Sequence, residues 1–194
     1  MVKIDKILIG THNKGKFKEI SQLLSKNIKK FSPITLKIKS PKETGKNFKE
    51  NAVLKANFFY KKSNIPVISD DSGIEISAFK GKPGINSARW AKKQGGFKKA
   101  MNKILINLKN KKNRNAIFVC CLALKIDKKR ALIVEGRKIG TIAKKIVGKN
   151  GFGYDPIFVP KGKSKTFGQI SKKLKMKTDH RFLAFKKLKK KIKI

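Results

Sequence analysis

Carboxylates are scarce in this sequence, and the few that remain indicate where chemistry is to be sought. The 194 residues include 51 Lys and Arg but only 11 Asp and Glu, so the formal net charge is +40. Three of these acids, Asp70, Asp71 and Glu75, fall within the short segment DDSGIE. A chain that has lost most of its carboxylates should keep those whose loss is costly. This cluster is therefore the first candidate for a catalytic site.

Adjacent carboxylates such as Asp70 and Asp71 repel each other unless a cation or a hydrogen-bond donor lies beside them. They follow the apolar run PVIS and precede Ser72 and Gly73, so we expect both to emerge at a strand end before a sharp turn. Magnesium suits such a pair, because it uses one or two carboxylates with phosphate oxygens and water, and it activates an attacking water. The alternative is that one Asp caps a turn and the other faces solvent.

A second candidate site is the segment GTHNKGKF at residues 10–17. It matches the phosphate-loop pattern G-x-x-x-x-G-K, but Phe17 stands where a Ser or Thr would hold magnesium. The segment lies between an apolar run and a helical pattern, and a helix N-terminus offers backbone N–H groups and a favourable dipole to an anion. Thr11, Asn13 and Lys16 would add side-chain donors. An ordinary strand-to-helix turn is the alternative.

The elements that must position these residues follow from the apolar periodicity of the chain. Helices are predicted over residues 17–24, 47–62, 97–108 and 181–194, and strands over residues 6–10, 66–69, 116–125, 131–137 and 157–159. The third and fourth strands are predicted to form a hairpin. The sequence shows neither an internal repeat nor a linker, so we expect one α/β domain with a mixed sheet.

The composition argues against several other classes of protein. The longest stretch without a charge, Asn115 to Leu124, is too short to span a membrane, and charges interrupt the N-terminal residues where a signal core would lie. We therefore expect a cytoplasmic protein without a membrane partner. Cys120 and Cys121 are neighbours that point to opposite faces of a strand, so buried, reduced thiols are predicted.

The high positive charge has two explanations. Only five of the 51 basic residues are Arg, whereas proteins that read nucleic acid favour Arg for its bidentate contacts. The lysines are dispersed along the whole chain, and Lys, Ile and Asn share A- and T-rich codons. We attribute the charge to compositional drift and predict no specific nucleic-acid partner. A non-enzymatic nucleic-acid-binding protein remains an alternative.

Taken together, the motifs resemble those of the inosine and xanthosine triphosphate pyrophosphatases, which hydrolyse nonstandard purine nucleoside triphosphates such as ITP, dITP and XTP. Six segments occur in the family's order: THNKGK at 11–16, ETG at 43–45 with FKENAVLKA at 48–56, SDDSGIE at 69–75, GKPGINSARWA at 81–91, GFGYDPIF at 151–158 and DHR at 179–181. The resemblance implies one pyrophosphatase domain over residues 1–194. It also implies an elongated two-lobed fold with a twisted sheet flanked by helices, an active-site cleft between the lobes, and a homodimer.

The resemblance further implies a role for each matching residue. Asp71 corresponds to the general base and a metal ligand, Glu43 to a second ligand of Mg2+, and Asp70 to an assisting carboxylate. The implied substrate-binding residues are Thr11, His12, Asn13, Lys14, Gly15, Lys16, Lys55, Ser72, Phe152, Gly153, Tyr154, Asp155, Lys175, His180 and Arg181. The first loop would bind the triphosphate, and Phe152 would stack on the purine. The products would be the nucleoside monophosphate and pyrophosphate.

Base selectivity follows from the donors implied at the purine. Hypoxanthine and xanthine present a keto oxygen at position six, and Lys175, His180 and Arg181 can donate to it, so adenine's amino group would be left unpaired. Asp179 departs from the family, in which a Ser commonly precedes the His-Arg pair; its carboxylate would pair with Arg181 or weaken a hydrogen bond to the base. A phosphate-loop kinase or nucleotide switch is the enzymatic alternative, but it has no use for GFGYDP.

Overall fold

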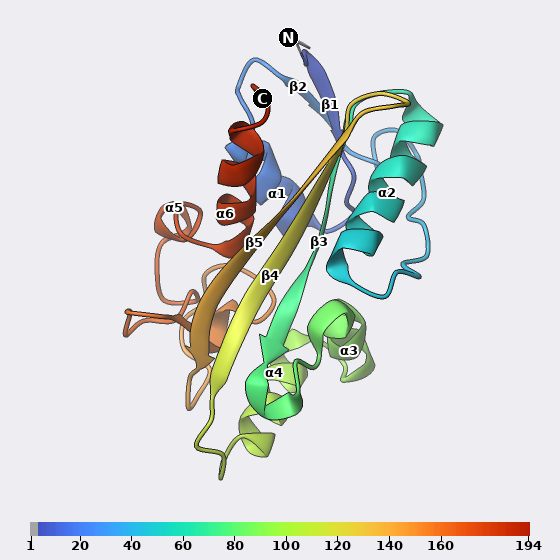
Figure 1. Cartoon of the computed structure of the whole chain (residues 1–194). Coiled ribbons are helices and arrows are strands. Elements are labelled where there is room, and N and C mark those ends of the chain that lie inside the picture. Colours follow the sequence, from blue (N-terminus) through green and yellow to red (C-terminus); the bar gives the residue numbers. More distant parts are fainter. Residues whose placement is uncertain (1–3) are drawn as a thin grey trace. The chain divides into compact units, whose positions relative to one another are not determined.

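The computed structural model describes residues 4–194, which form two compact units (Figure 1). Unit 1 comprises the described residues up to Asp71, together with Cys120–Gly136 and Arg181–Ile194. Unit 2 comprises Ser72–Val119 and Arg137–His180. Three long strands continue from one unit into the other.

A six-stranded sheet runs in the order β2-β1-β3-β4-β5-β6. The strands are β1 (Lys6–Ile9), β2 (Lys29–Phe31), β3 (Val67–Ile76), β4 (Asn115–Lys125), β5 (Ala131–Ile142) and β6 (Phe158–Pro160). Strand β1 pairs in parallel with β2 and β3, whereas β5 and β6 are antiparallel. The predicted α/β class with a mixed sheet is confirmed; the two-lobed cleft stays a prediction.

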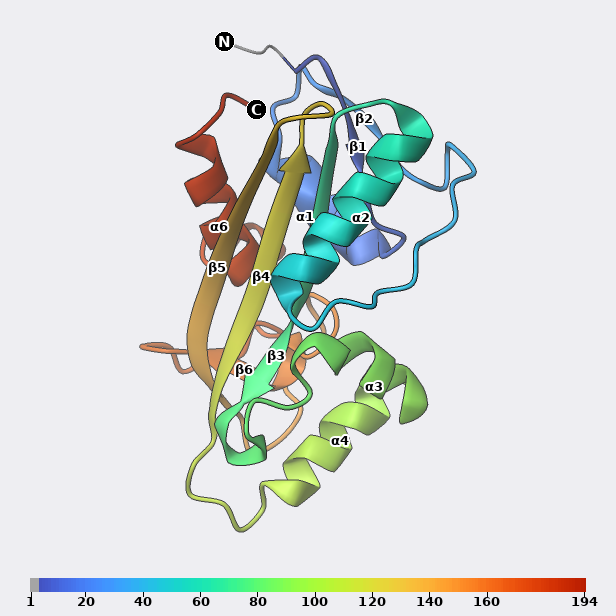
Figure 2. The same ribbon diagram turned by 45° about the vertical axis from the view of Figure 1, so that its right-hand side comes forward.

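The helices are α1 (Lys14–Leu23), α2 (Phe48–Ser63), α3 (Ser87–Lys93), α4 (Phe97–Asn107), α5 (Lys172–Lys175) and α6 (His180–Lys189). In unit 1, α1 and α6 cover one face of the strands and α2 covers the other (Figures 1 and 2). The side chain of Asn13 caps α1 and that of Asn47 caps α2, each by accepting a backbone N–H. These caps fix the start of both helices next to the segments predicted to bind substrate.

Each unit has its own apolar core. In unit 1, Ile7, Ile9 and Ile68 are fully buried against residues of α1 and α6, as the two-residue alternation of a strand requires. In unit 2, the ring centroids of Phe118 and Phe158 lie 4.4 Å apart within the core.

Strand β3 departs from the sequence-based expectation, because it continues through Asp70 and Asp71 as far as Ile76. The sharp turn expected at Ser72 and Gly73 is absent. A Cβ on Gly73 would lie 2.3 Å from the carbonyl oxygen of Gly84, so this glycine serves close packing instead of a turn. The two aspartates therefore lie in mid-strand and point to opposite faces.

The other differences are smaller. The C-terminal helix ends at Lys189 and β5 extends to Ile142, while β2, α3 and α5 were not predicted. Cys120 and Cys121 are buried and form no disulfide, as expected, and burial raises the pKa of Cys121 to about 11. Within residues 4–194, no helix has the length and apolarity needed to cross a membrane.

Candidate active site

Asp70 belongs to a buried network of four charged side chains in unit 1. The Asp70 carboxylate is fully buried; its Oδ2 accepts from Arg181 Nη2 at 3.0 Å and lies 3.2 Å from Lys16 Nζ. Arg181 also donates through Nη1 to Glu19 of α1. Three of these side chains are at most 5% exposed, whereas that of Lys16 keeps 16% of its surface accessible. The network thus fixes the Lys16 ammonium at the end of the segment predicted to bind phosphate.

The charges of this network determine the protonation of Asp70. Burial acts to raise the pKa of Asp70, but the nearby charges of Lys16 and Arg181 outweigh it and hold the pKa far below its ordinary value of 3.8. Asp70 is therefore permanently ionised near neutral pH and is a poor general base. Its carboxylate orients cations instead.

The structure gives Arg181 partners that the sequence did not indicate. Its guanidinium is 1% exposed and binds Glu19 and Asp70. The predicted contact between Arg181 and the purine base stays a prediction. Glu19 was missed, although its position on α1, three residues after Lys16, and the scarcity of acids were available as signals.

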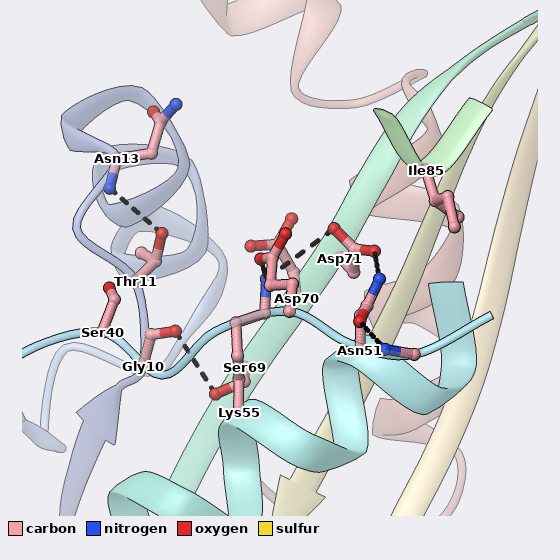
Figure 3. Close-up of polar contacts among 12 residues, drawn as sticks. Gly10, Thr11, Asn13, Ser40, Asn51, Lys55, Ser69, Asp70, Asp71 and Ile85 are labelled. Atoms are coloured by element: carbon pink, nitrogen blue, oxygen red, sulfur yellow. Dashed lines mark hydrogen bonds and ion pairs between the residues drawn. The ribbon is translucent and has the colours of Figure 1, made fainter. Parts of the chain in front are cut away.

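Asp71 points to the opposite face of β3, toward α2 (Figure 3). Its Oδ2 accepts from Asn51 Nδ2 at 3.1 Å, and its Oδ1 lies 3.7 Å from Lys55 Nζ. The Asn51 side chain is held in turn by the N–H of Gly45, which donates to Asn51 Oδ1 at 2.8 Å. The carboxylate is thereby oriented from α2 and from the ETG segment predicted to bind metal.

The environment of Asp71 shifts its protonation in the direction a base requires. Burial raises the pKa of Asp71 above its ordinary value, and the opposing charge of Lys55 does not cancel this effect. A carboxylate with a raised pKa accepts a proton more readily. The pKa values of the two neighbouring aspartates are thus shifted in opposite directions.

Lys55 joins the two carboxylates predicted to hold a metal. Its Nζ lies 2.6 Å from Glu43 Oε1 and 3.7 Å from Asp71 Oδ1. Burial acts to lower the pKa of Lys55, but the charges of Asp70, Asp71 and Glu43 outweigh it and raise the pKa. Glu43 and Asp71 therefore converge on one positive charge.

Magnesium is the metal predicted at Glu43 and Asp71. The part of the chain that the structure describes contains no group of three or more His, Cys, Asp or Glu side chains able to hold a metal. Magnesium does not require one, since it uses one or two carboxylates and takes its other ligands from phosphate and water. Glu43 and Asp71, two oxygen donors that face a common cation, fit that pattern.

Local hydrogen bonds hold the loop before α1, which is predicted to bind the triphosphate. Asn13 Oδ1 accepts the N–H of Lys16 at 3.0 Å, and Thr11 Oγ1 accepts the N–H of Asn13 at 3.2 Å. Thr11, His12, Asn13 and Lys14 line one side of a cavity of about 470 Å³. His12 Nδ1 lies 2.6 Å from Ser40 Oγ, which fixes the imidazole. The cap uses the Lys16 N–H, while the dipole of α1 still favours an anion near the start of the helix.

Unit 2 brings together most of the residues predicted to bind the base. Asp155 Oδ2 accepts from Lys175 Nζ and from the N–H of Phe152, both at 2.8 Å. The Lys175 ammonium lies 4.8 Å from the centre of the Phe152 ring, and the His180 ring stacks on Phe118. Asp155 therefore fixes both the loop that carries Phe152 and the Lys175 side chain.

Three further residues predicted to contact the substrate are Tyr154, Ser72 and Gly153. Tyr154 is 3% exposed and donates through its hydroxyl to the carbonyl oxygen of Ser87 at 2.9 Å. Burial raises the pKa of Tyr154, so its hydroxyl stays protonated. Ser72 is half-buried beside Asp71 on β3, and Gly153 adopts a φ of 65°, which glycine tolerates without strain.

Residues 7–191 match the model of the Ham1 family. The chain belongs to this family. It is 40% identical over 195 residues to the dITP/XTP pyrophosphatase of Bacillus subtilis (strain 168), covering 98% of each chain. It is 41% identical to the dITP/XTP pyrophosphatase of Dictyoglomus thermophilum, covering 94% of this chain and 92% of that protein. Among solved structures it is similar to the Staphylococcus aureus Ham1 protein, with a TM-score of 0.85, 35% identity, and coverage of 95% of this chain and 96% of that chain.

Proposed function

We propose that this Ham1-family chain is a pyrophosphohydrolase that converts ITP, dITP and XTP to the nucleoside monophosphate and pyrophosphate. The observation that carries the proposal is the geometry of the two neighbouring aspartates: Asp70 is buried against Lys16 and Arg181, whereas Asp71 faces Asn51 and converges with Glu43 on Lys55. The pKa values of the two carboxylates are shifted in opposite directions, which suits Asp70 to orienting cations and Asp71 to accepting a proton. The names of the relatives support the substrate class.

In this proposal Asp71 accepts the proton of the attacking water, and Asn51 keeps its carboxylate in one orientation. Thr11, His12, Asn13, Lys14, Gly15 and Lys16 bind the triphosphate, with Lys55 and Ser72 as further contacts. Glu43 and Asp71 would hold Mg2+, which when bound would neutralise phosphate charge and lower the pKa of water. The triphosphate would be oriented further by the loop at residues 11–16 and by the buried network around Asp70.

For the base, we propose Phe152 as the stacking residue and Gly153, Tyr154, Asp155, Lys175, His180 and Arg181 as the other contacts. The donors among them suit the keto oxygen at purine position six. The short distance between Lys175 and the Phe152 ring supports a site for a planar ring with a polar edge. Three further statements stay predictions: that residues 1–194 act as one domain, that the protein forms a homodimer, and that it is cytoplasmic.

A turnover panel tests this function. With magnesium, ITP and dITP are expected to be hydrolysed with a kcat/KM about 10²-fold or more above that for ATP, because adenine leaves buried donors unpaired. Pyrophosphate is measured as the product, and excess chelator should abolish turnover. A kinase or switch would instead release inorganic phosphate, and a nucleic-acid-binding protein would show no hydrolysis but a steep loss of affinity with salt.

The phosphate-binding segment is tested separately by Lys16→Ala. We expect the KM for ITP to rise about tenfold or more, because a charge-assisted contact to phosphate contributes roughly 1.5–3 kcal/mol. Steady-state kinetics give KM and kcat, and Lys26→Ala, at an exposed lysine, provides the matched control. An unchanged KM would remove this loop from the site.

A further inference from the structure

Two segments of unit 2 are hydrogen-bonded to each other beside the proposed purine site: the purine loop, residues 147–155, and the clamp segment, residues 166–170. Thr166 is 1% exposed, and its Oγ1 donates to the carbonyl oxygen of Val147 at 2.7 Å. Its N–H donates to Gln169 Oε1 at 2.9 Å, within the clamp segment. Thr166 is thus held by its own segment and holds the first residue of the purine loop.

Further contacts join the two segments along their length. The N–H of Gly168 donates to the carbonyl oxygen of Asp155 at 3.0 Å, and the carbonyl oxygen of Gly168 accepts the N–H of Asn150 at 2.9 Å. Asn150 Nδ2 also donates to the carbonyl oxygen of Ile170 at 2.9 Å. The two backbones are so close that a Cβ on Gly148 would lie 2.0 Å from the carbonyl carbon of Gly168. The purine loop is therefore held at both ends and between them.

The clamp segment leads directly to the second group proposed to contact the purine. Ser171 follows the segment and caps α5 by accepting the N–H of Leu174 at 3.3 Å, and Lys175 is the last residue of that helix. The Lys175 ammonium lies 4.8 Å from the centre of the Phe152 ring, which the purine loop carries. The hydrogen bonds of the clamp segment therefore restrict the movement of these two side chains relative to each other.

We propose that Thr166 is a positioning residue for the purine loop. The inference rests on the proposed function, in which the base lies against Phe152 and Lys175. A loop that is already fixed in the free protein binds without an ordering cost, whereas a loop that opens lowers the apparent affinity in proportion to the closed fraction. Because the Thr166 hydroxyl is buried, its removal takes this donor from the Val147 carbonyl oxygen and favours opening of the loop.

The effect of Thr166 should be confined to binding of the base. Contacts to the purine that are equally strong in the substrate and in the transition state change KM without changing kcat. Pyrophosphate has no base, and the segment proposed to bind phosphate, residues 11–16, belongs to unit 1 and takes part in none of the hydrogen bonds just described. Opening of the purine loop should therefore weaken inhibition by the product IMP and leave inhibition by pyrophosphate unchanged.

The experiment replaces Thr166 with Val, which has nearly the same shape but no hydroxyl, and with Ser, which keeps the hydroxyl. In Thr166→Val we expect the KM for ITP and the inhibition constant of IMP to rise about tenfold, the effect of one lost buried hydrogen bond. The kcat and the inhibition constant of pyrophosphate should stay within about twofold of the wild type. Thr166→Ser should keep all four constants near the wild type. Thr141→Val, at an exposed position of β5, is the matched control and should also change none of them.

A second variant keeps the inference testable if Thr166→Val does not fold. Asn150 is exposed, so Asn150→Ala removes the side-chain hydrogen bond to Ile170 without opening the core. This variant should raise the inhibition constant of IMP about threefold and leave that of pyrophosphate unchanged. Hydrogen exchange measured by mass spectrometry, without substrate, should be faster in residues 147–155 of Asn150→Ala and of Thr166→Val than in the wild type.

Several results would overturn the inference while leaving the proposed function in place. These are equal rises in the inhibition constants of IMP and pyrophosphate, a lower kcat with an unchanged KM, and wild-type constants in a folded Thr166→Val. A Thr166→Ser variant as impaired as Thr166→Val would likewise show that packing, and not the hydroxyl, matters. A wild type that releases no pyrophosphate from ITP would instead overturn the proposed function, together with the inference that rests on it.

Discussion

Asp71→Asn is expected to lower kcat for ITP by about 10³-fold or more while the fold stays intact. The amide cannot accept a proton from water, and it is a weaker metal ligand than a carboxylate. It is nearly isosteric, so it can still contact Asn51 and Lys55 from its place on β3. Steady-state release of pyrophosphate measures the effect, with Asp5→Asn as a control for loss of one negative charge.

The same substitution should leave stability unchanged or increase it. Burial raises the pKa of Asp71, so the ionised form is less favourable in the folded chain than in the unfolded one. Replacing the carboxylate with a neutral amide removes the free-energy cost of burying its charge. Such gains in stability are common when a catalytic residue is replaced, because active sites are often less stable than their surroundings would allow. Thermal unfolding at pH 7.5 measures this. A variant that keeps a near-normal rate would show that another group is the base.

The composition of the sequence was enough to locate these aspartates, but the course of β3 through them was not predictable locally. Ser72 and Gly73 have the residue types of a turn. The strand continues because Gly73 packs against Gly84 and because Ser87 Oγ accepts the N–H of Ile74 at 2.9 Å. Both contacts come from a segment more than ten residues further along the chain, which no local pattern reveals.

The partners of the charged residues were equally hidden. Loop chemistry predicted that Lys16 binds a phosphate, which stays a prediction; the structure places Lys16 in the first turn of α1, 3.2 Å from Asp70. Sequence spacing could not pair Arg181 with Glu19 and Asp70, because these contacts span most of the chain. Nor could it show that Lys175 is shared by Asp155 and Asp179. Charge partners are set by tertiary packing, whereas the starts of α1 and α2 follow from the local capping residues Asn13 and Asn47.

Asp70→Asn is expected to lower the free energy of unfolding by about 3–5 kcal/mol, the usual effect of removing one partner from a buried ion pair. Glu19 alone would then balance Lys16 and Arg181, and a buried positive charge would be left in excess. Urea unfolding at pH 7 measures the loss. Asp71→Asn, one residue along the same strand, is the matched control and should show no such loss.

The way in which the free energy of unfolding changes with pH distinguishes a stabilising ion-pair network at Asp70 from apolar packing alone. The pKa of Asp70 is lower in the folded chain than in the unfolded chain, so its contribution is fully present above the ordinary pKa of 3.8 and is lost as the pH falls further. The free energy of unfolding of the wild type should therefore decline more steeply than that of Asp70→Asn as the pH is lowered from about 5. Parallel declines, or equal stability of the two aspartate variants at pH 7, would contradict the assignment. Glu19→Gln should destabilise in the same direction as Asp70→Asn, because it leaves the same guanidinium short of a counter-charge.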